Sequence, residues 1–207
     1  MDGTLFDTLP DIREVLNGTL KYFNLPVLSE ESVKRYIGNG ARELVRLAIG
    51  KENAHRLDEI LAHYKKEYAK NDGSLSRFFE GEQEVLLRLK QSGVKLAVFT
   101  NKPHAVALNT NEKYFKRFSF DCILGQTDDL PLKPAPDGVY KIVQSLGVNA
   151  DECLFVGDGE TDVETAGNAG MDCISVLWGY RTKEQLEEAG ATRFVRSFAQ
   201  LQNEILG

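Results

Sequence analysis

Four short apolar runs in the second half of the chain constrain its fold more than any other feature. They read VKLAVFT (94–100), FDCIL (120–124), CLFVG (153–157) and DCISVLW (172–178). Helix-like stretches alternate with these runs, at 82–92, 104–114, 136–146 and 162–169. Short strands that are apolar on both faces and alternate with helices are typical of a parallel sheet covered on both sides. The sequence therefore predicts an α/β fold with a Rossmann-like parallel sheet core.

Residues 10–76 have a different pattern. Apolar residues recur there at helical spacing, and no strand-like run interrupts them. A Gly-Asn-Gly break at 38–40 separates two of the expected helices. The sequence therefore predicts a helical region at 10–76 that is distinct from the alternating strands and helices after it.

Composition excludes several classes of protein. The net charge of −6 and the pI of about 5.2 argue against nucleic acid or an anionic membrane as a partner. No apolar run approaches the roughly 18 residues of a membrane span, and no signal peptide is recognisable, so we expect a cytoplasmic protein. Cys122, Cys153 and Cys173 fall in apolar runs, which predicts reduced, buried thiols.

Polar residues stand where the expected strands end. In a parallel sheet, ligands bind outside the carboxyl ends of the strands, so these residues are expected to lie near one another. The opening turn of the chain would also fit a strand end if a strand preceded it. The set comprises Asp2, Gly3, Thr4, Thr100, Asn101, Lys133, Asp158 and Asp162.

The chemistry of this set points to phosphate. Clustered carboxylates repel one another and persist best around a hard cation, and oxygen-only ligands suit Mg²⁺. A metal ion, an ammonium group and a hydroxyl group together match the charge of a phosphoryl group. Taken singly, Asp162 could be only a helix cap and Lys133 only a solvated loop residue. Taken together, the residues predict metal-assisted phosphoryl transfer.

Four motifs follow one another along the chain: MDGT (1–4), VFTNK (98–102), LKP (132–134) and GDGETD (157–162). In this order they resemble the four signature motifs of the haloacid dehalogenase superfamily of phosphohydrolases. The resemblance covers essentially the whole chain. Residues 10–76 look like the family's helical cap, which would be inserted into a core of residues 1–9 and 77–207. The segments DGTLFDT, IGNGARELV and GDGETDVETAGNAGM resemble its phosphoglycolate phosphatase branch.

The resemblance implies roles for the acidic residues. Asp2 would be the general acid and base, and its backbone carbonyl would bind Mg²⁺. Asp158 would be a second metal ligand, and Asp162 would bind the metal or its waters.

The resemblance also implies a phosphate-binding set. Thr100 and Asn101 would contact the phosphoryl oxygens, and Lys133 would neutralise their charge. Gly3 and Thr4 would present backbone N–H groups to the same oxygens.

One part of the family pattern is missing. The family's nucleophile is an Asp two residues before Asp2, at the end of a central strand, and neither belongs to the sequence. Three interpretations remain: residues before Met1 supply both, the chain is an inactive fragment or regulatory phosphate-binding relative, or Asp7 substitutes for the nucleophile. Without that strand and nucleophile we expect the chain to be inactive.

The turn at 38–40 opens a helix whose free N–H groups could bind an anion. Arg42 lies in its first turn, and we expect it to contact the carboxylate of a small substrate such as phosphoglycolate. Alternatively, Arg42 is solvated. Pyrophosphate and other small esters remain possible substrates. The expected partner is a small phosphate ester, with the protein a monomer or homodimer.

Overall fold

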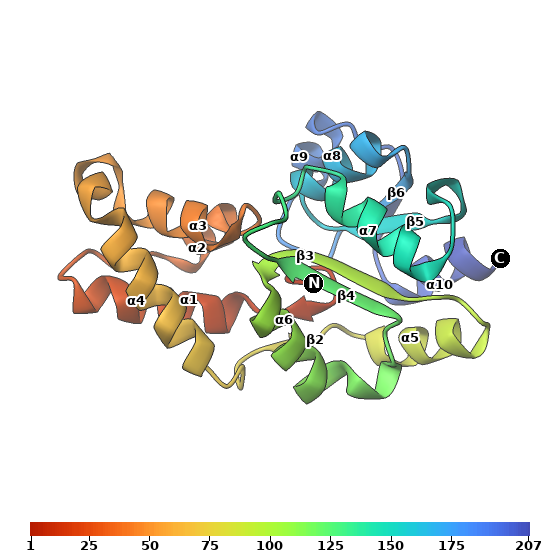
Figure 1. The fold of residues 1–207 in the computed structure, drawn as a ribbon, viewed down its shortest axis with the longest axis horizontal. Helices are drawn as coiled ribbons and strands as arrows, with labels where there is room; N and C mark the ends of the chain where they lie inside the picture. The colour runs from red at the N-terminus through yellow and green to blue at the C-terminus, as the bar shows by residue number, and fades with distance from the viewer.

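The computed structural model describes residues 1–207 and contains two parallel sheets (Figure 1). In the first, β3 (Ala97–Pro103) pairs with β4 (Cys122–Gln126). In the second, β5 (Leu154–Gly157) pairs with β6 (Asp172–Val176), which pairs with β7 (Phe194–Val195). The predicted α/β fold with parallel strands is confirmed.

Helices flank these sheets. They are α5 (Glu82–Gln91), α6 (His104–Thr110), α7 (Asp137–Leu146), α8 (Glu160–Ala169), α9 (Lys183–Glu188) and α10 (Phe198–Leu206). A π-helical turn (Asn111–Phe115) follows α6, and short 3₁₀ turns lie at Lys116–Phe118 and Ala150–Glu152. Side-chain caps fix two helix starts, because Thr182 and Ser197 accept hydrogen bonds from the backbone of the following turn. No helix combines the length and the apolar character that a membrane span needs.

A separate group of helices lies to one side of the sheets, at the left of Figure 1. It contains α1 (Leu9–Tyr22), α2 (Glu30–Tyr36), α3 (Gly40–Ile49), the 3₁₀ turn Lys51–Arg56 and α4 (Leu57–Lys70). We call residues 9–70 the helical segment. Its apolar faces form their own core, in which Leu16, Leu20 and Ile60 are fully buried. The boundaries of a cap domain at 10 and 76 stay a prediction.

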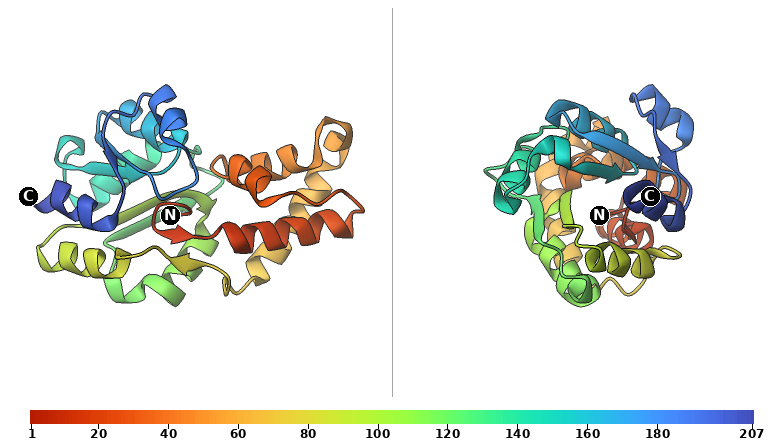
Figure 2. Two further views of the ribbon diagram at one scale, coloured as in Figure 1. Left: turned by 180° about the vertical axis from the view of Figure 1, so that it is seen from behind. Right: turned by 90° about the vertical axis from the view of Figure 1, so that its right-hand side faces the viewer.

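The chain enters and leaves the helical segment through a two-stranded antiparallel pair. In it β1 (Phe6–Asp7) lies beside β2 (Arg77–Phe78). The ring of Phe6 packs against Phe78 and Phe115, so this connection is anchored in an aromatic cluster. The C-terminus lies at the end of the molecule away from the helical segment (Figure 2).

The two parallel sheets are not hydrogen-bonded to each other. Each of β3 and β5 has a single partner strand. Met1 packs against Val98 of β3, and the Thr4 hydroxyl, three residues later, donates to Asp158, just past the end of β5. The central strand expected between the two sheets therefore stays a prediction.

The thiols differ from the expectation of full burial. Cys122, Cys153 and Cys173 are free, as predicted, but only half-buried. Each directly follows an exposed acidic residue near the amino end of its strand, where the sheet meets solvent.

Candidate active site

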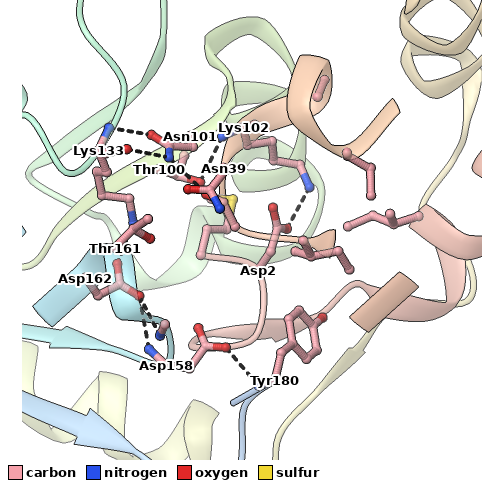
Figure 3. A pocket seen from close by; sticks show the side chains of 18 of the residues that line it. Asp2, Asn39, Thr100, Asn101, Lys102, Lys133, Asp158, Thr161, Asp162 and Tyr180 are labelled. Atoms are coloured by element: carbon pink, nitrogen blue, oxygen red, sulfur yellow. Dashed lines mark hydrogen bonds and ion pairs between the residues drawn. The ribbon is translucent and has the colours of Figure 1, made fainter. Parts of the chain in front are cut away.

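A small cavity lies where the ends of the strands face the helical segment (Figure 3). Its volume is about 90 Å³. The strand ends, the loops that follow them and the turn before α3 all contribute to its lining. Six of the residues predicted for the site line it: Asp2, Thr100, Asn101, Lys133, Asp158 and Asp162.

Asp158 is enclosed by donors. The Thr4 hydroxyl donates to its Oδ1 at 2.7 Å, and the backbone N–H of Tyr180 donates to its Oδ2 at 2.9 Å. Burial and the nearby charge of Asp162 nevertheless raise the pKa of the Asp158 carboxyl. A carboxylate held in this way would gain from a bound cation.

Two glycines make this enclosure possible. Gly3 has a φ of +76°, and a Cβ at this position would lie 2.2 Å from Oδ2 of Asp158. A Cβ at Gly179 would lie 2.2 Å from the Cβ of Asp158. Only a chain without side chains at these positions can wrap around the carboxylate so closely.

Asp162 forms the second acidic position. Its Oδ1 accepts a hydrogen bond from Lys133 Nζ at 2.5 Å. Its Oδ2 accepts from the N–H groups of Asp158 and Gly159 at 3.1 and 3.0 Å, which fastens the loop before α8. Burial opposes ionisation of Asp162, but the charge and hydrogen bond of Lys133 outweigh it and lower the pKa of this carboxyl.

The Asp2 carboxylate points toward a different cation. Its Oδ1 accepts from Lys102 Nζ and from the Thr8 hydroxyl, both at 2.8 Å. Burial opposes ionisation, but the Lys102 charge and these hydrogen bonds keep the pKa of Asp2 below its ordinary value. The Lys102 side chain is only 4% exposed, and its Nζ also donates to the hydroxyl of Tyr68 at 2.6 Å.

Lys102 was not among the predicted site residues. The apolar run ends at Thr100, but β3 continues to Pro103, so the strand carries Lys102 into the interior. The only sequence signal was its position in the VFTNK motif. Thr100 itself is buried, and its hydroxyl accepts from the Lys102 N–H at 3.2 Å.

Arg181 is a second residue that the sequence did not reveal. Its Nε lies 2.8 and 2.7 Å from the carboxylate oxygens of Glu160, and its side chain is 8% exposed. Its Nη atoms donate to the carbonyls of Lys34 and Ile37, at 2.9 and 2.6 Å. Arg181 thus joins the loop after β6 to the end of α2.

Four other candidates do not line the cavity. The Gly3 N–H donates to the Phe6 carbonyl at 2.9 Å, and the Thr4 hydroxyl donates to Asp158.

Arg42 is exposed and its Nη1 pairs with Oδ1 of Asp58 at 2.7 Å, so the predicted carboxylate contact gains no support here and stays a prediction. Asp7 accepts hydrogen bonds from the Tyr180 hydroxyl and the Leu9 N–H, at 3.2 and 3.3 Å. It therefore does not present its carboxylate to the site as a replacement nucleophile.

The chain matches one known family over most of its length. The model of the haloacid dehalogenase-like hydrolases matches residues 1–176. The chain belongs to this family. Curated relatives include phosphoglycolate phosphatase 1 of Pseudomonas aeruginosa, which is 33% identical over 97% of this chain and 76% of its own length. The phosphoglycolate phosphatase of Mannheimia succiniciproducens is also 33% identical, over 97% and 93% of the two chains.

Solved structures of similar proteins share the fold. A protein from Lactobacillus delbrueckii subsp. bulgaricus superimposes with a TM-score of 0.91 at 31% identity, over 100% of this chain and 96% of the other. A predicted phosphoglycolate phosphatase from Haemophilus somnus gives a TM-score of 0.86 at 29% identity, over 99% and 95%.

In this haloacid dehalogenase-like hydrolase, only two of the three acidic residues predicted to bind Mg²⁺ have their carboxylates close together. No group of three or more His, Cys, Asp or Glu residues is gathered closely enough to hold a metal, because the Asp2 carboxylate is turned to Lys102. Asp158 and Asp162 do lie together, and the charge of Asp162 raises the cost of ionising Asp158. Since Mg²⁺ keeps several waters and often uses only one or two carboxylates, this pair fits it.

Proposed function

We propose that the protein is a Mg²⁺-dependent phosphomonoester hydrolase that acts on a small phosphorylated acid such as phosphoglycolate. The names of its relatives support the substrate class. The observation that carries the proposal is the meeting of Asp2, Lys133 and the Asp158–Asp162 pair around one small cavity. A site with these groups can hold a phosphoryl group and move a proton beside it.

The proposed roles follow from the contacts. Thr100 and Lys133 line the cavity and bind the phosphoryl oxygens in this proposal, with Asn101 beside them. The N–H groups of Gly3 and Thr4 would complete this set, but the Gly3 N–H donates to the Phe6 carbonyl at 2.9 Å and would have to leave it first. A Mg²⁺ ion held by Asp158, Asp162 and the backbone carbonyl of Asp2 would supply positive charge to the same oxygens.

Asp2 performs the proton transfers in this proposal. It protonates the oxygen of the leaving alcohol and later removes a proton from the attacking water. The contact with Lys102 at 2.8 Å favours the ionised form, which is the form that the second step needs. The first step requires a protonated Asp2 that has turned toward the substrate.

The nucleophile would be an Asp immediately before Met1, which forms an aspartyl-phosphate that water then hydrolyses. The single pairing of β3 and of β5, with residues 1–4 in contact with Val98 and Asp158, supports a strand at this place. The alternative of an inactive relative gains no support from the comparisons. Reading the codons before Met1 tests this point: an in-frame Asp codon after an apolar stretch is expected, and a stop codon there would contradict it.

The function itself is tested by phosphate release. In full-length protein, which includes the residues before Met1, we expect hydrolysis of phosphoglycolate that needs Mg²⁺ and is at least about a hundredfold lower in Asp158→Asn. The exposed Asp129→Asn is a matched control and should retain turnover. Mg²⁺ should also raise the melting temperature of the unmodified protein but not of Asp158→Asn. Equal turnover in both variants would contradict the metal assignment, and preference for pyrophosphate would change the substrate class.

Several further points are part of this proposal. Residues 10–76 would act as a cap over a core of residues 1–9 and 77–207. The protein would work in the cytoplasm as a monomer or homodimer.

A further inference from the structure

Three cations line the cavity, and they are not equivalent. Arg181 has its Nε on Glu160 and its Nη atoms on carbonyls at the end of α2, so each of its three nitrogens already has a protein partner. Lys133 is paired with Asp162, on the side proposed to bind the phosphoryl group. Lys102 stands apart from both, beside Asp2.

Lys102 has one N–H donor, and Tyr68 its O–H donor, that no group in the structure accepts. An ammonium group has three N–H donors, and the hydrogen bonds to Asp2 and Tyr68 use two of them. The Tyr68 hydroxyl accepts from Lys102, while its own proton has no acceptor among the hydrogen bonds of the structure. Both side chains line the cavity. A carboxylate placed there would find two unused donors, one of them charged.

The chemistry of the substrate brings a carboxylate to this place. The leaving oxygen must come within hydrogen-bond reach of Asp2 for proton transfer. In phosphoglycolate a single carbon separates that oxygen from the carboxylate carbon. Because Lys102 Nζ lies 2.8 Å from Asp2 and 2.6 Å from the Tyr68 hydroxyl, the carboxylate of a substrate bound at Asp2 can reach these two groups.

The Tyr68 ring forms the side of the cavity that faces a second, larger space. A second cavity of about 310 Å³ lies on the other side of Lys102 and Tyr68, which line both spaces. The Tyr68 ring stacks on the buried Tyr64 with centroids 5.5 Å apart, which holds it in place as a wall. We therefore expect the Asp2 side of this wall to favour a short acid.

We propose that Lys102 and Tyr68 recognise the non-reacting carboxylate of the substrate, a role for which the sequence had suggested Arg42. This inference rests on the proposed phosphatase function. Lys102 comes from β3 and Tyr68 from α4 of the helical segment. The acid would therefore be held by both parts of the molecule at once.

The test compares two esters of similar shape. Isobutyl phosphate has methyl groups where phosphoglycolate has carboxylate oxygens. In Tyr68→Phe, which keeps the ring and loses the donor, the ratio of kcat/KM for phosphoglycolate to that for isobutyl phosphate should fall roughly tenfold to a hundredfold. Lys102→Met should lower the same ratio at least as much, and should also lower kcat for both esters because it releases Asp2. Tyr22→Phe, which changes an exposed ring of the helical segment, should leave the ratio unchanged.

Binding without turnover separates this inference from the proposed function. Calorimetry should show that the unmodified protein binds phosphonopropionate, a non-hydrolysable relative of phosphoglycolate, more tightly than an alkylphosphonate of the same length. Tyr68→Phe and Lys102→Met should each lose this preference, with melting curves confirming that the variants are folded. A preference that survives both substitutions would overturn the inference. Absence of turnover with any ester, with the binding preference intact, would instead contradict the proposed function.

Discussion

The side-chain amide of Asn101 holds the backbone of Lys133 at both of its polar groups. Its Oδ1 accepts from the Lys133 N–H at 2.8 Å, and its Nδ2 donates to the Lys133 carbonyl at 3.3 Å. The same Nδ2 donates to the carbonyl of Gly38 at 2.9 Å. One amide therefore fixes the loop of a proposed phosphate-binding lysine and ties it to the helical segment.

Replacing Asn101 with Asp should loosen both connections. The substitution keeps the shape but turns the donor into a charged acceptor that faces two carbonyl oxygens. We expect a loss of roughly 1–3 kcal/mol in the free energy of unfolding and roughly a tenfold to hundredfold fall in phosphoglycolate turnover. Urea unfolding and phosphate release measure the two effects. Asn203→Asp, on the exposed face of α10, is the matched control, and equal behaviour of both variants would refute the role of Asn101.

Arg181 provides a second connection between the helical segment and the sheets. Replacing it with Lys keeps the charge but removes the planar fork that contacts Glu160 and the carbonyls of Lys34 and Ile37 together. We expect faster hydrogen exchange of the amides in α2 and a cost of about 1–3 kcal/mol in the free energy of unfolding. The exposed Arg88→Lys, in α5, should change neither quantity. Unchanged exchange in Arg181→Lys would show that other contacts hold α2.

Removing the Tyr68 ring should join the two cavities. The smaller has a volume of about 90 Å³ and the larger about 310 Å³. We expect Tyr68→Ala to hydrolyse a bulkier ester such as ribose phosphate at least about tenfold better than the unmodified protein. Tyr22→Ala is the control, because it truncates an exposed ring away from both cavities. If Tyr68→Ala is folded but gains nothing on the bulkier ester, the ring does not set the size limit.

Glu82 should make the stability of the protein depend on pH. Burial raises the pKa of its carboxyl to about 8, although Oε2 accepts a hydrogen bond from the Phe79 N–H. Its Oε1 has no hydrogen-bond partner. The folded protein therefore holds a proton that the unfolded chain releases near the ordinary value of 4.5. As pH rises between these values, the free energy of unfolding should fall by up to about 1.4 kcal/mol per pH unit.

Urea unfolding at several pH values tests this prediction. Glu82→Gln cannot lose a proton, so it should remove this part of the slope and be more stable than the unmodified protein above about pH 8. Glu14→Gln, at an exposed position on α1, should keep the slope. Parallel pH profiles for Glu82→Gln and the unmodified protein would show that the Glu82 carboxyl is ionised in the fold.

The sequence was most informative at positions where polar residues stand near a strand-like apolar run. Asp158 and Lys133 were found because they stand in short motifs beside expected strands, and a parallel sheet brings such positions to one edge. The strands themselves were predicted to within a few residues. The exceptions are β1, β2 and β7, which contain two residues each and so carry no usable periodicity.

Other parts of the site depend on contacts that no local pattern records. Lys102 and Tyr68 are 34 residues apart, and Arg181 reaches a carbonyl 147 residues away. Lys102 would ordinarily be assigned to solvent, because lysine is almost never fully buried without a partner. Its partner is Asp2, in the turn at the start of the chain, and only the folded structure brings this turn next to β3.

Tyr180 belongs to two parts of the molecule at once. Its ring is buried in the core of the helical segment, its hydroxyl accepts from the N–H groups of Thr8 and Leu9, and its own N–H donates to Asp158. A side chain shared in this way makes the folding of the helices and of the sheets cooperative. Heating should therefore give one calorimetric transition with equal van't Hoff and calorimetric enthalpies, and Tyr180→Ala should split it into two.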